Sequence, residues 1–191
     1  MKSDKKSQKS DEQAKPAKPT YLGLLNAIAI GEARADTVLR IWRDTTSSSD
    51  LAQVLDFVAI REREHAAAFT KRLCELGFAL REKPSETHDV HLSLAASNVG
   101  DREKFKALLN IDAENAAEDP FSGLFQDTSI DPATGALLGR YIAEERDSDR
   151  RLRGAWTLLA EDDAKDEVLD DIARRLERLT ETLEELKSLR S

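Results

Sequence analysis

Apolar residues recur every three or four positions along four segments of the chain, which is the spacing of amphipathic helices. These segments span residues 21–43, 51–77, 132–160 and 166–189. In the last segment every repeated position is apolar, at Leu169, Ile172, Leu176, Leu179, Leu183 and Leu186. The pattern therefore predicts an all-α protein with four long helices.

Turn and capping residues divide these helices. Residues 45–50 (TTSSSD) form a polar turn with an N-cap for the second helix, and Gly77 ends that helix with Phe78 as the apolar partner of a glycine C-cap. Asp131–Pro132 begins the third helix sharply. Residues 161–165 predict a short acidic turn before the fourth helix. We therefore expect two antiparallel hairpins.

The segment between the hairpins, residues 79–131, lacks the helical pattern. It is interrupted by Pro84, Gly100, Pro120 and Gly123. We expect a long crossover there with only short helices, such as 101–110 behind an Asp cap. His88 and His91 fall in this insert and could be extra ligands, although solvated loop histidines are more common.

Composition and charge further restrict the expected fold and the expected partners. Charged residues make up 35% of the 191 positions and aromatic residues 5%, which favours one domain of long helices. Residues 1–19 are rich in Lys, Ser and Gln without apolar periodicity, so we expect a disordered tail ahead of one bundle spanning residues 20–191. A net charge of -8 argues against nucleic acid or an anionic membrane as partner.

Two further absences suggest a cytoplasmic protein. No apolar run approaches the ~18 residues of a membrane helix, and no hydrophobic segment follows the N-terminal lysines as in a secretory signal. Cys74 is the single cysteine, which excludes an intrachain disulfide and a Cys-x-x-Cys metal centre. We expect its thiol to be buried and inert.

Polar side chains occupy positions in three of the stripes where a core helix normally carries leucine. They are Glu32 in the first helix, Glu62 and His65 in the second, and Glu145 and Asp149 in the third. Burying such groups without a partner costs several kcal/mol. Glu-x-x-His places both side chains on one helical face, a spacing with which helical bundles hold metal ions. These five residues are therefore candidate metal ligands.

The heights of these groups support a common site. Glu32 and Glu62 both lie ~22 Å from the first hairpin turn at the helical rise, so they are level across the hairpin. Carboxylates and imidazole suit Fe(II), Mn(II) or Zn(II). We expect the second ring nitrogen of His65 to be held by Asp36 or Asp149. Glu144 could replace Glu145 if the third helix is rotated.

Two hairpins joined by a long crossover, with Glu32 on one helix and Glu62-x-x-His65 on the next, resemble the ferritin-like superfamily, including rubrerythrins and encapsulated ferritins. The resemblance implies a ferritin-like four-helix bundle that binds iron for iron oxidation or O2 or peroxide chemistry. It also implies that helix 132–160 runs parallel to helix 51–77, which places Glu145 ~21 Å from the first turn. The fourth helix departs from the family, because leucines stand where its second Glu-x-x-His belongs.

This departure leaves two metal-binding arrangements open. The first is a site within one chain made by Glu32, Glu62, His65 and Glu145, with Asp149 as an outer ligand. In the second, which resembles the encapsulated ferritins, two first hairpins meet at a two-fold axis and build a di-iron site across a homodimer or larger homo-oligomer. Glu62 would be the bridging ligand. Mn or Zn are alternatives to iron.

A third arrangement needs no metal, because the polar groups could satisfy one another, for instance Glu62 against Arg34 or Arg61. The protein would then be a structural or interaction module. Its fourth helix, with leucines at near-heptad spacing and charged flanks, would form an intermolecular coiled coil. Tyr141, one turn before Glu145, is expected in the core, with a place beside the metal as the alternative.

Overall fold

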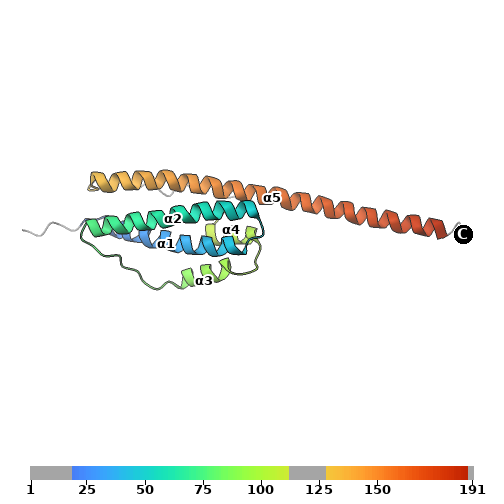
Figure 1. Ribbon diagram of the computed structural model, residues 1–191, viewed down its shortest axis with the longest axis horizontal. Coiled ribbons are helices and arrows are strands. Elements are labelled where there is room, and N and C mark those ends of the chain that lie inside the picture. The colour runs from blue at the N-terminus through green and yellow to red at the C-terminus, as the bar shows by residue number, and fades with distance from the viewer. Residues whose placement is uncertain (1–18, 112–127, 189–191) are drawn as a thin grey trace, which may run out of the picture.

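The computed structural model describes residues 19–111 and 128–188. Within these ranges all regular structure is helical: α1 is Leu22–Thr45, α2 Ser49–Glu75, α3 Glu86–Ala95, α4 Asp101–Leu109 and α5 Pro132–Ser188. The helices α1 and α2 form an antiparallel hairpin, and the first half of α5 packs along it (Figure 1). The all-α prediction is confirmed. The predicted tail lies, except for Pro19, outside the described residues.

The α1–α2 hairpin forms as the sequence predicts, with ends within two residues of the expected ones. The Ser48 hydroxyl accepts a hydrogen bond from the Leu51 amide at 3.2 Å and so caps α2. Gly77 adopts a left-handed conformation with φ of 82°. The Phe78 amide then donates to the carbonyl of Leu73 at 2.9 Å, which closes α2 with a Schellman-type C-cap.

Two apolar clusters fill the bundle, one at each end. The cluster at the α1–α2 turn includes Trp42, Leu51, Leu55, Phe105 and Trp156. The cluster at the opposite end includes Leu25, Phe69, Leu73, Leu138 and Ile142. Fully burying one such side chain contributes ~1.5–3 kcal/mol. The polar positions of the three stripes lie between the two clusters, so the cores fix the middle of the bundle from both sides.

The direction of α5 differs from the one implied by the ferritin-like resemblance. Asp131, just before α5, accepts hydrogen bonds from the Tyr21 hydroxyl at 2.7 Å and from Arg72 at 2.8 Å. It therefore lies where α1 begins and α2 ends, and α5 runs antiparallel to α2. The connection already reaches the α1–α2 turn at Ala95, whose carbonyl accepts from Thr45. The connection after α2 therefore returns along the bundle to its turn end by Ala95, whereas α5 begins at the opposite end.

The turn predicted at residues 161–165 does not form. The chain continues as one helix of 57 residues from Pro132 to Ser188. Residues 161–165 contain neither Gly nor Pro, and their Glu, Ala and Lys residues are good helix formers. The acidic character of these residues alone therefore does not end the helix. The second half of α5 extends beyond the bundle (Figure 1). The prediction of a second hairpin is therefore wrong, and a four-helix bundle within one chain is not confirmed.

Smaller differences concern the insert and the cysteine. Asp101 does not cap α4, because its carboxylate accepts from the Trp42 indole and the Thr46 hydroxyl, both at 2.6 Å, and so joins α4 to α1. His88 and His91 lie on the helix α3 rather than in a loop. Cys74 is exposed rather than buried. No helix in the described parts of the chain is long and apolar enough to cross a membrane.

Asp131 generates a stability prediction. Its Oδ1 accepts from the Thr134 amide at 3.1 Å, and hydrogen bonds from Thr134 and Tyr21 hold the pKa of Asp131 well below its usual range. We expect Asp131→Ala to lower the free energy of unfolding by ~1–2 kcal/mol at pH 7, as loss of a helix N-cap does. Because the folded pKa is depressed, this contribution is complete well above the ordinary pKa of 3.8 and declines as the pH falls below it towards the folded value, so it should be smaller at pH 3 than at pH 7.

Urea denaturation at pH 7 and at pH 3 measures both effects. The control is Asp170→Ala, which removes an exposed carboxylate from the second half of α5. Equal unfolding free energies for the two variants at pH 7 would contradict a capping role for Asp131.

Candidate metal centre

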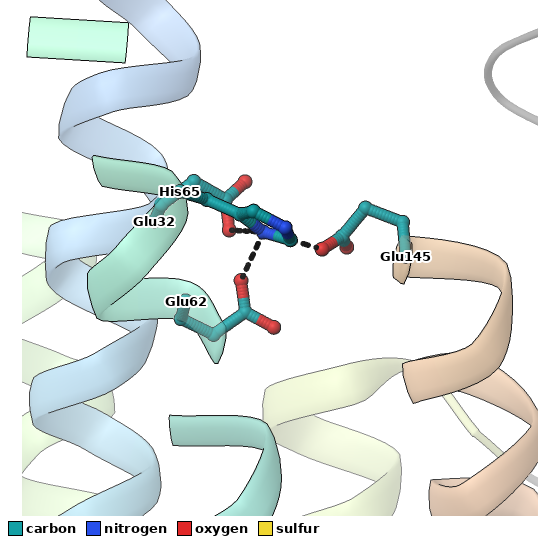
Figure 2. Close-up of side chains that lie close together, drawn as sticks. All are labelled: Glu32, Glu62, His65 and Glu145. Carbon is teal, nitrogen blue, oxygen red and sulfur yellow. Dashed lines mark ion pairs between the residues drawn. The ribbon is translucent and has the colours of Figure 1, made fainter. Parts of the chain in front are cut away.

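Four polar side chains meet at mid-height in the bundle (Figure 2). Glu32 comes from α1, Glu62 and His65 from α2, and Glu145 from α5. Each offers one ligand atom, and these atoms all lie within 4.8 Å of one another. Of the five ligands expected from the sequence, the structure brings together these four.

The Nδ1 atom of His65 is the centre of the group. It lies 3.9 Å from Glu32 Oε2, 3.9 Å from Glu62 Oε2 and 3.1 Å from Glu145 Oε1. Two ligand atoms that each bind one ion at ~2.1 Å lie at most ~4.2 Å apart. The three distances around Nδ1 meet this limit, and the widest separation in the group, at most 4.8 Å, exceeds it by no more than ~0.6 Å, so small side-chain movements would bring all four side chains to one ion.

Two atoms of this group lack hydrogen bonds. His65 Nδ1 and Glu145 Oε1 are buried and have no hydrogen-bond partner, so the 3.1 Å between them does not have hydrogen-bond geometry. Buried polar atoms are normally paired, and each exception needs an explanation. A cation between the imidazole lone pair and the carboxylates would satisfy both atoms. The residues therefore fit a metal ion.

Burial changes the ionisation of the group when no metal is bound. Desolvation raises the pKa of Glu62 to about 9 and also raises the pKa of Glu145. Desolvation disfavours the imidazolium of His65, but Glu145 and three further glutamates outweigh it and raise its pKa to about 12. Contacts with His65, Glu62 and Tyr141 overcome the same desolvation at Glu32 and lower its pKa. Protons thus supply the positive charge that a cation would bring.

Glu144 also contacts the candidate site, although it was expected from the sequence only as a replacement for Glu145. Its Oε2 lies 2.8 Å from His65 Nε2, while Arg140 donates to its Oε1 at 2.9 Å. The ring of His65 thus lies between the consecutive residues Glu144 and Glu145, one at each nitrogen. A carboxylate on the second nitrogen fixes the tautomer and orientation of a ligand histidine. The expectation that Asp36 or Asp149 holds this nitrogen is wrong.

Those two aspartates pair with arginines on their own helices. Arg153 donates to both carboxylate oxygens of Asp149 at 3.0 Å, and the Asp149 side chain is 46% exposed. Arg40 donates to Asp36 Oδ2 at 2.9 Å. The structure therefore does not bring Asp149 into the ligand group.

Tyr141 lies in the core and also beside the site. Its hydroxyl donates to Glu32 Oε1 at 2.7 Å, and its ring packs edge-on against His65 with centroids 5.0 Å apart. Burial raises the pKa of Tyr141, so the phenol stays neutral and remains a donor. Tyr141 therefore fixes one oxygen of Glu32 and leaves the other facing His65.

The pairings proposed for a bundle without metal are not formed. Arg34 donates to Glu82 and to the carbonyl of Lys83. Arg61 donates to Asp147, at 3.0 Å, and to the carbonyl of Glu144. Because both guanidinium groups bind elsewhere, neither neutralises Glu62.

Two cavities border the group. The larger one, of about 470 Å³, is lined by Glu32, Glu62 and Glu145 together with His88 and His91 of α3. The other, of about 330 Å³, is lined by residues that include His65, Tyr141 and Glu144. Small molecules and ions thus have space to approach the candidate ligands.

The chain matches no protein-family model, and no curated protein or solved structure is detectably similar to it. The case for a function therefore rests on the geometry and chemistry of the site.

The pKa values predict how the metal-free protein responds to pH. Glu62 and His65 have folded-state pKa values of about 9 and 12, above their ordinary values of 4.5 and 6.5. Each group therefore stabilises the fold below its ordinary pKa and loses that contribution as the pH rises through the folded value. We expect the melting temperature in chelator to fall between pH 6.5 and pH 9.

Glu62→Gln removes one of these titrations and should make the fall shallower. The matched control is Glu64→Gln, an exposed neighbour on α2. Differential scanning calorimetry at several pH values measures the slope. The same slope in wild type and Glu62→Gln would show that Glu62 does not titrate in this range.

Proposed function

We propose that the chain is a metal-binding protein in which Glu32, Glu62, His65 and Glu145 hold one divalent transition-metal ion, Fe(II) in the first place. The observation that carries the proposal is that two buried atoms, His65 Nδ1 and Glu145 Oε1, lie 3.1 Å apart without a hydrogen bond, among further carboxylates. Three carboxylates with one imidazole suit Fe(II), Mn(II) or Zn(II) and lack the thiolates that softer metals prefer.

The ferritin-like resemblance supports iron and a ferritin-like activity. It rests on the α1–α2 hairpin, which carries Glu32, Glu62 and His65 at one level, and on Glu145, which arrives from α5. Bound iron would supply one-electron chemistry with O2 or peroxide. We propose iron oxidation or peroxide removal as the activity, with an external reductant in the second case.

The residues around the ligands have separate roles in this proposal. Glu144 orients His65 through its Nε2 atom, and Tyr141 holds Glu32 through a hydrogen bond of 2.7 Å. Glu145 of the same chain occupies the side of the α1–α2 hairpin that a second hairpin would need at a two-fold site. This favours one ion per chain over a di-iron centre shared by a dimer.

The first test is the effect of metal on thermal stability. A ligand that binds only the folded state at a concentration of 100 Kd stabilises by ~2.7 kcal/mol. For a chain of this size we expect anaerobic Fe(II) or Mn(II) to raise the melting temperature by ~5–10 °C. Glu62→Ala with His65→Ala should abolish the rise, because it removes two ligands.

Glu64→Ala is the control, since this exposed glutamate lies between the two ligands on α2 and should keep the full rise. Elemental analysis of the loaded protein should find one ion per chain. The proposal would be eliminated if neither metal raised the melting temperature of the wild type and the double variant were more stable than the wild type.

The second test concerns Glu144. Loss of a carboxylate that orients a ligand histidine typically weakens metal binding 10–100-fold. We expect Glu144→Gln to weaken Mn(II) affinity by about that factor, measured by titration calorimetry, with one ion per chain still bound at saturation. Arg140→Gln, which removes only the outer contact of Glu144, should weaken binding less. Unchanged affinity in Glu144→Gln would show that Glu144 does not position His65.

A further inference from the structure

The larger cavity beside the candidate ligands has more space than the chemistry proposed for them requires. Its volume of about 470 Å³ is many times the ~30 Å³ that one water molecule takes in the liquid, and O2 and hydrogen peroxide are also very small molecules. The volume lies in the range of ~300–1,000 Å³ that is typical of binding sites for small organic molecules. Iron oxidation or peroxide removal therefore leaves most of this space without a role.

The apolar wall of this cavity lies towards the α1–α2 turn. The residues of this wall include Val38, Leu39, Val58, Leu109 and Leu152. Val38 in α1, Val58 in α2 and Leu152 in α5 are four to seven positions nearer the turn than the candidate ligand of the same helix. This difference is ~6–10 Å at the helical rise. The cavity is therefore amphipathic, with carboxylates at mid-height and apolar side chains nearer the turn.

Two imidazoles supply unused hydrogen-bonding groups at the same cavity. His88 and His91 are one turn apart on α3, and both are half-buried and line the cavity. Within residues 19–111 and 128–188, neither ring has a hydrogen bond or an ion pair. An imidazole carries at least one N–H donor whether it is neutral or protonated. The two rings can therefore donate hydrogen bonds to a molecule inside the cavity.

The charged side chains that line the cavity already have partners. Three of them are glutamates of the candidate metal group. Asp149 accepts two hydrogen bonds from Arg153, and Arg34 donates to Glu82. An ammonium group in the cavity would therefore compete with the metal ion or with Arg153 for a carboxylate. A carboxylate, in contrast, would meet the N–H groups of the two imidazoles.

We propose that this cavity binds a small organic acid with an aliphatic body. The carboxylate of the acid accepts hydrogen bonds from His88 and His91, and its body packs against the apolar wall near Val38 and Leu152, where burial removes it from water. The inference goes beyond the proposed metal binding and does not depend on it, because neither the imidazoles nor the apolar wall belongs to the ligand group. The bound acid would lie beside the metal-binding group, which borders the same cavity.

Gly31 provides the first test, because it lines the cavity and a Cβ added there would meet nothing within 4 Å. Gly31→Leu therefore fills part of the cavity without a clash, and leucine is a better helix former than glycine, so the fold should persist. Titration calorimetry of the metal-free wild type with octanoate should show saturable binding of one molecule per chain. Gly31→Leu should weaken this binding ~10-fold or more, because the added side chain overfills the site.

The matched control for this variant is Gly23→Leu. Gly23 is a second glycine of α1 at which an added Cβ meets nothing within 4 Å, but it does not line the cavity. This variant should bind octanoate as the wild type does. Thermal melting of each variant shows whether it is folded.

The imidazoles provide the second test. His88→Leu together with His91→Leu should weaken octanoate binding ~10-fold or more, because hydrogen bonds to a charged group are lost. Ser93→Leu is the control, since this exposed residue of α3 does not line the cavity. Octylamine, which has a similar aliphatic chain with an ammonium group, should bind the wild type less tightly than octanoate.

The proposal would be overturned by a wild type without saturable octanoate binding, by unchanged affinity in Gly31→Leu or in the histidine double variant, or by octylamine binding as tightly as octanoate. The melting-temperature rise with Mn(II) should persist in the double variant, so a failed acid site and a failed metal site give different results. Loss of that rise would assign the two imidazoles to the metal ion and would also overturn the proposal.

Discussion

The cost of burying ionisable groups is the constraint on which the centre of this protein depends. Three glutamates and a histidine lie between two apolar clusters, where each charge is removed from most of its water. In the absence of metal, shifted protonation and mutual attraction supply part of the compensation. They leave His65 Nδ1 and Glu145 Oε1 without hydrogen bonds. A divalent cation would compensate all four groups at once.

The same constraint explains how α5 is held on the hairpin. Besides its apolar residues, α5 contributes Glu145 and Glu144 to the two nitrogens of His65, Tyr141 to Glu32, and Asp131 to Arg72. The polar contacts therefore join the helix to both α1 and α2 at mid-height. A bound ion would strengthen this junction, so metal binding and the docking of α5 would be coupled.

The sequence was sufficient for features that depend on helix geometry. Periodicity and caps identified the α1–α2 hairpin, and the polar positions within its stripes identified Glu32, Glu62 and His65. The helical rise predicted their common height. Glu145 reached this level although α5 runs opposite to the expected direction. It lies near the middle of the part of α5 that packs along the hairpin, so its height is similar counted from either end of that part.

Other features depend on contacts that the pattern does not encode. The acidic segment 161–165 lacks a Gly or Pro that would break the helix, so the change of face between the two stripes of α5 does not require a turn. Glu144 was one residue from the predicted ligand, and only the position of the His65 ring shows that both glutamates contact it. The arginines near Glu62 bind other acceptors, which no helical spacing could show.

Anomalous diffraction from crystals grown with Fe(II) tests the central claim most directly. The account predicts one peak per chain at the iron absorption edge, within bonding distance of Glu32, Glu62, Glu145 and His65 Nδ1, with Glu144 still on Nε2. The contradicting result is a map without a peak there, in which the three glutamates remain paired with a protonated His65.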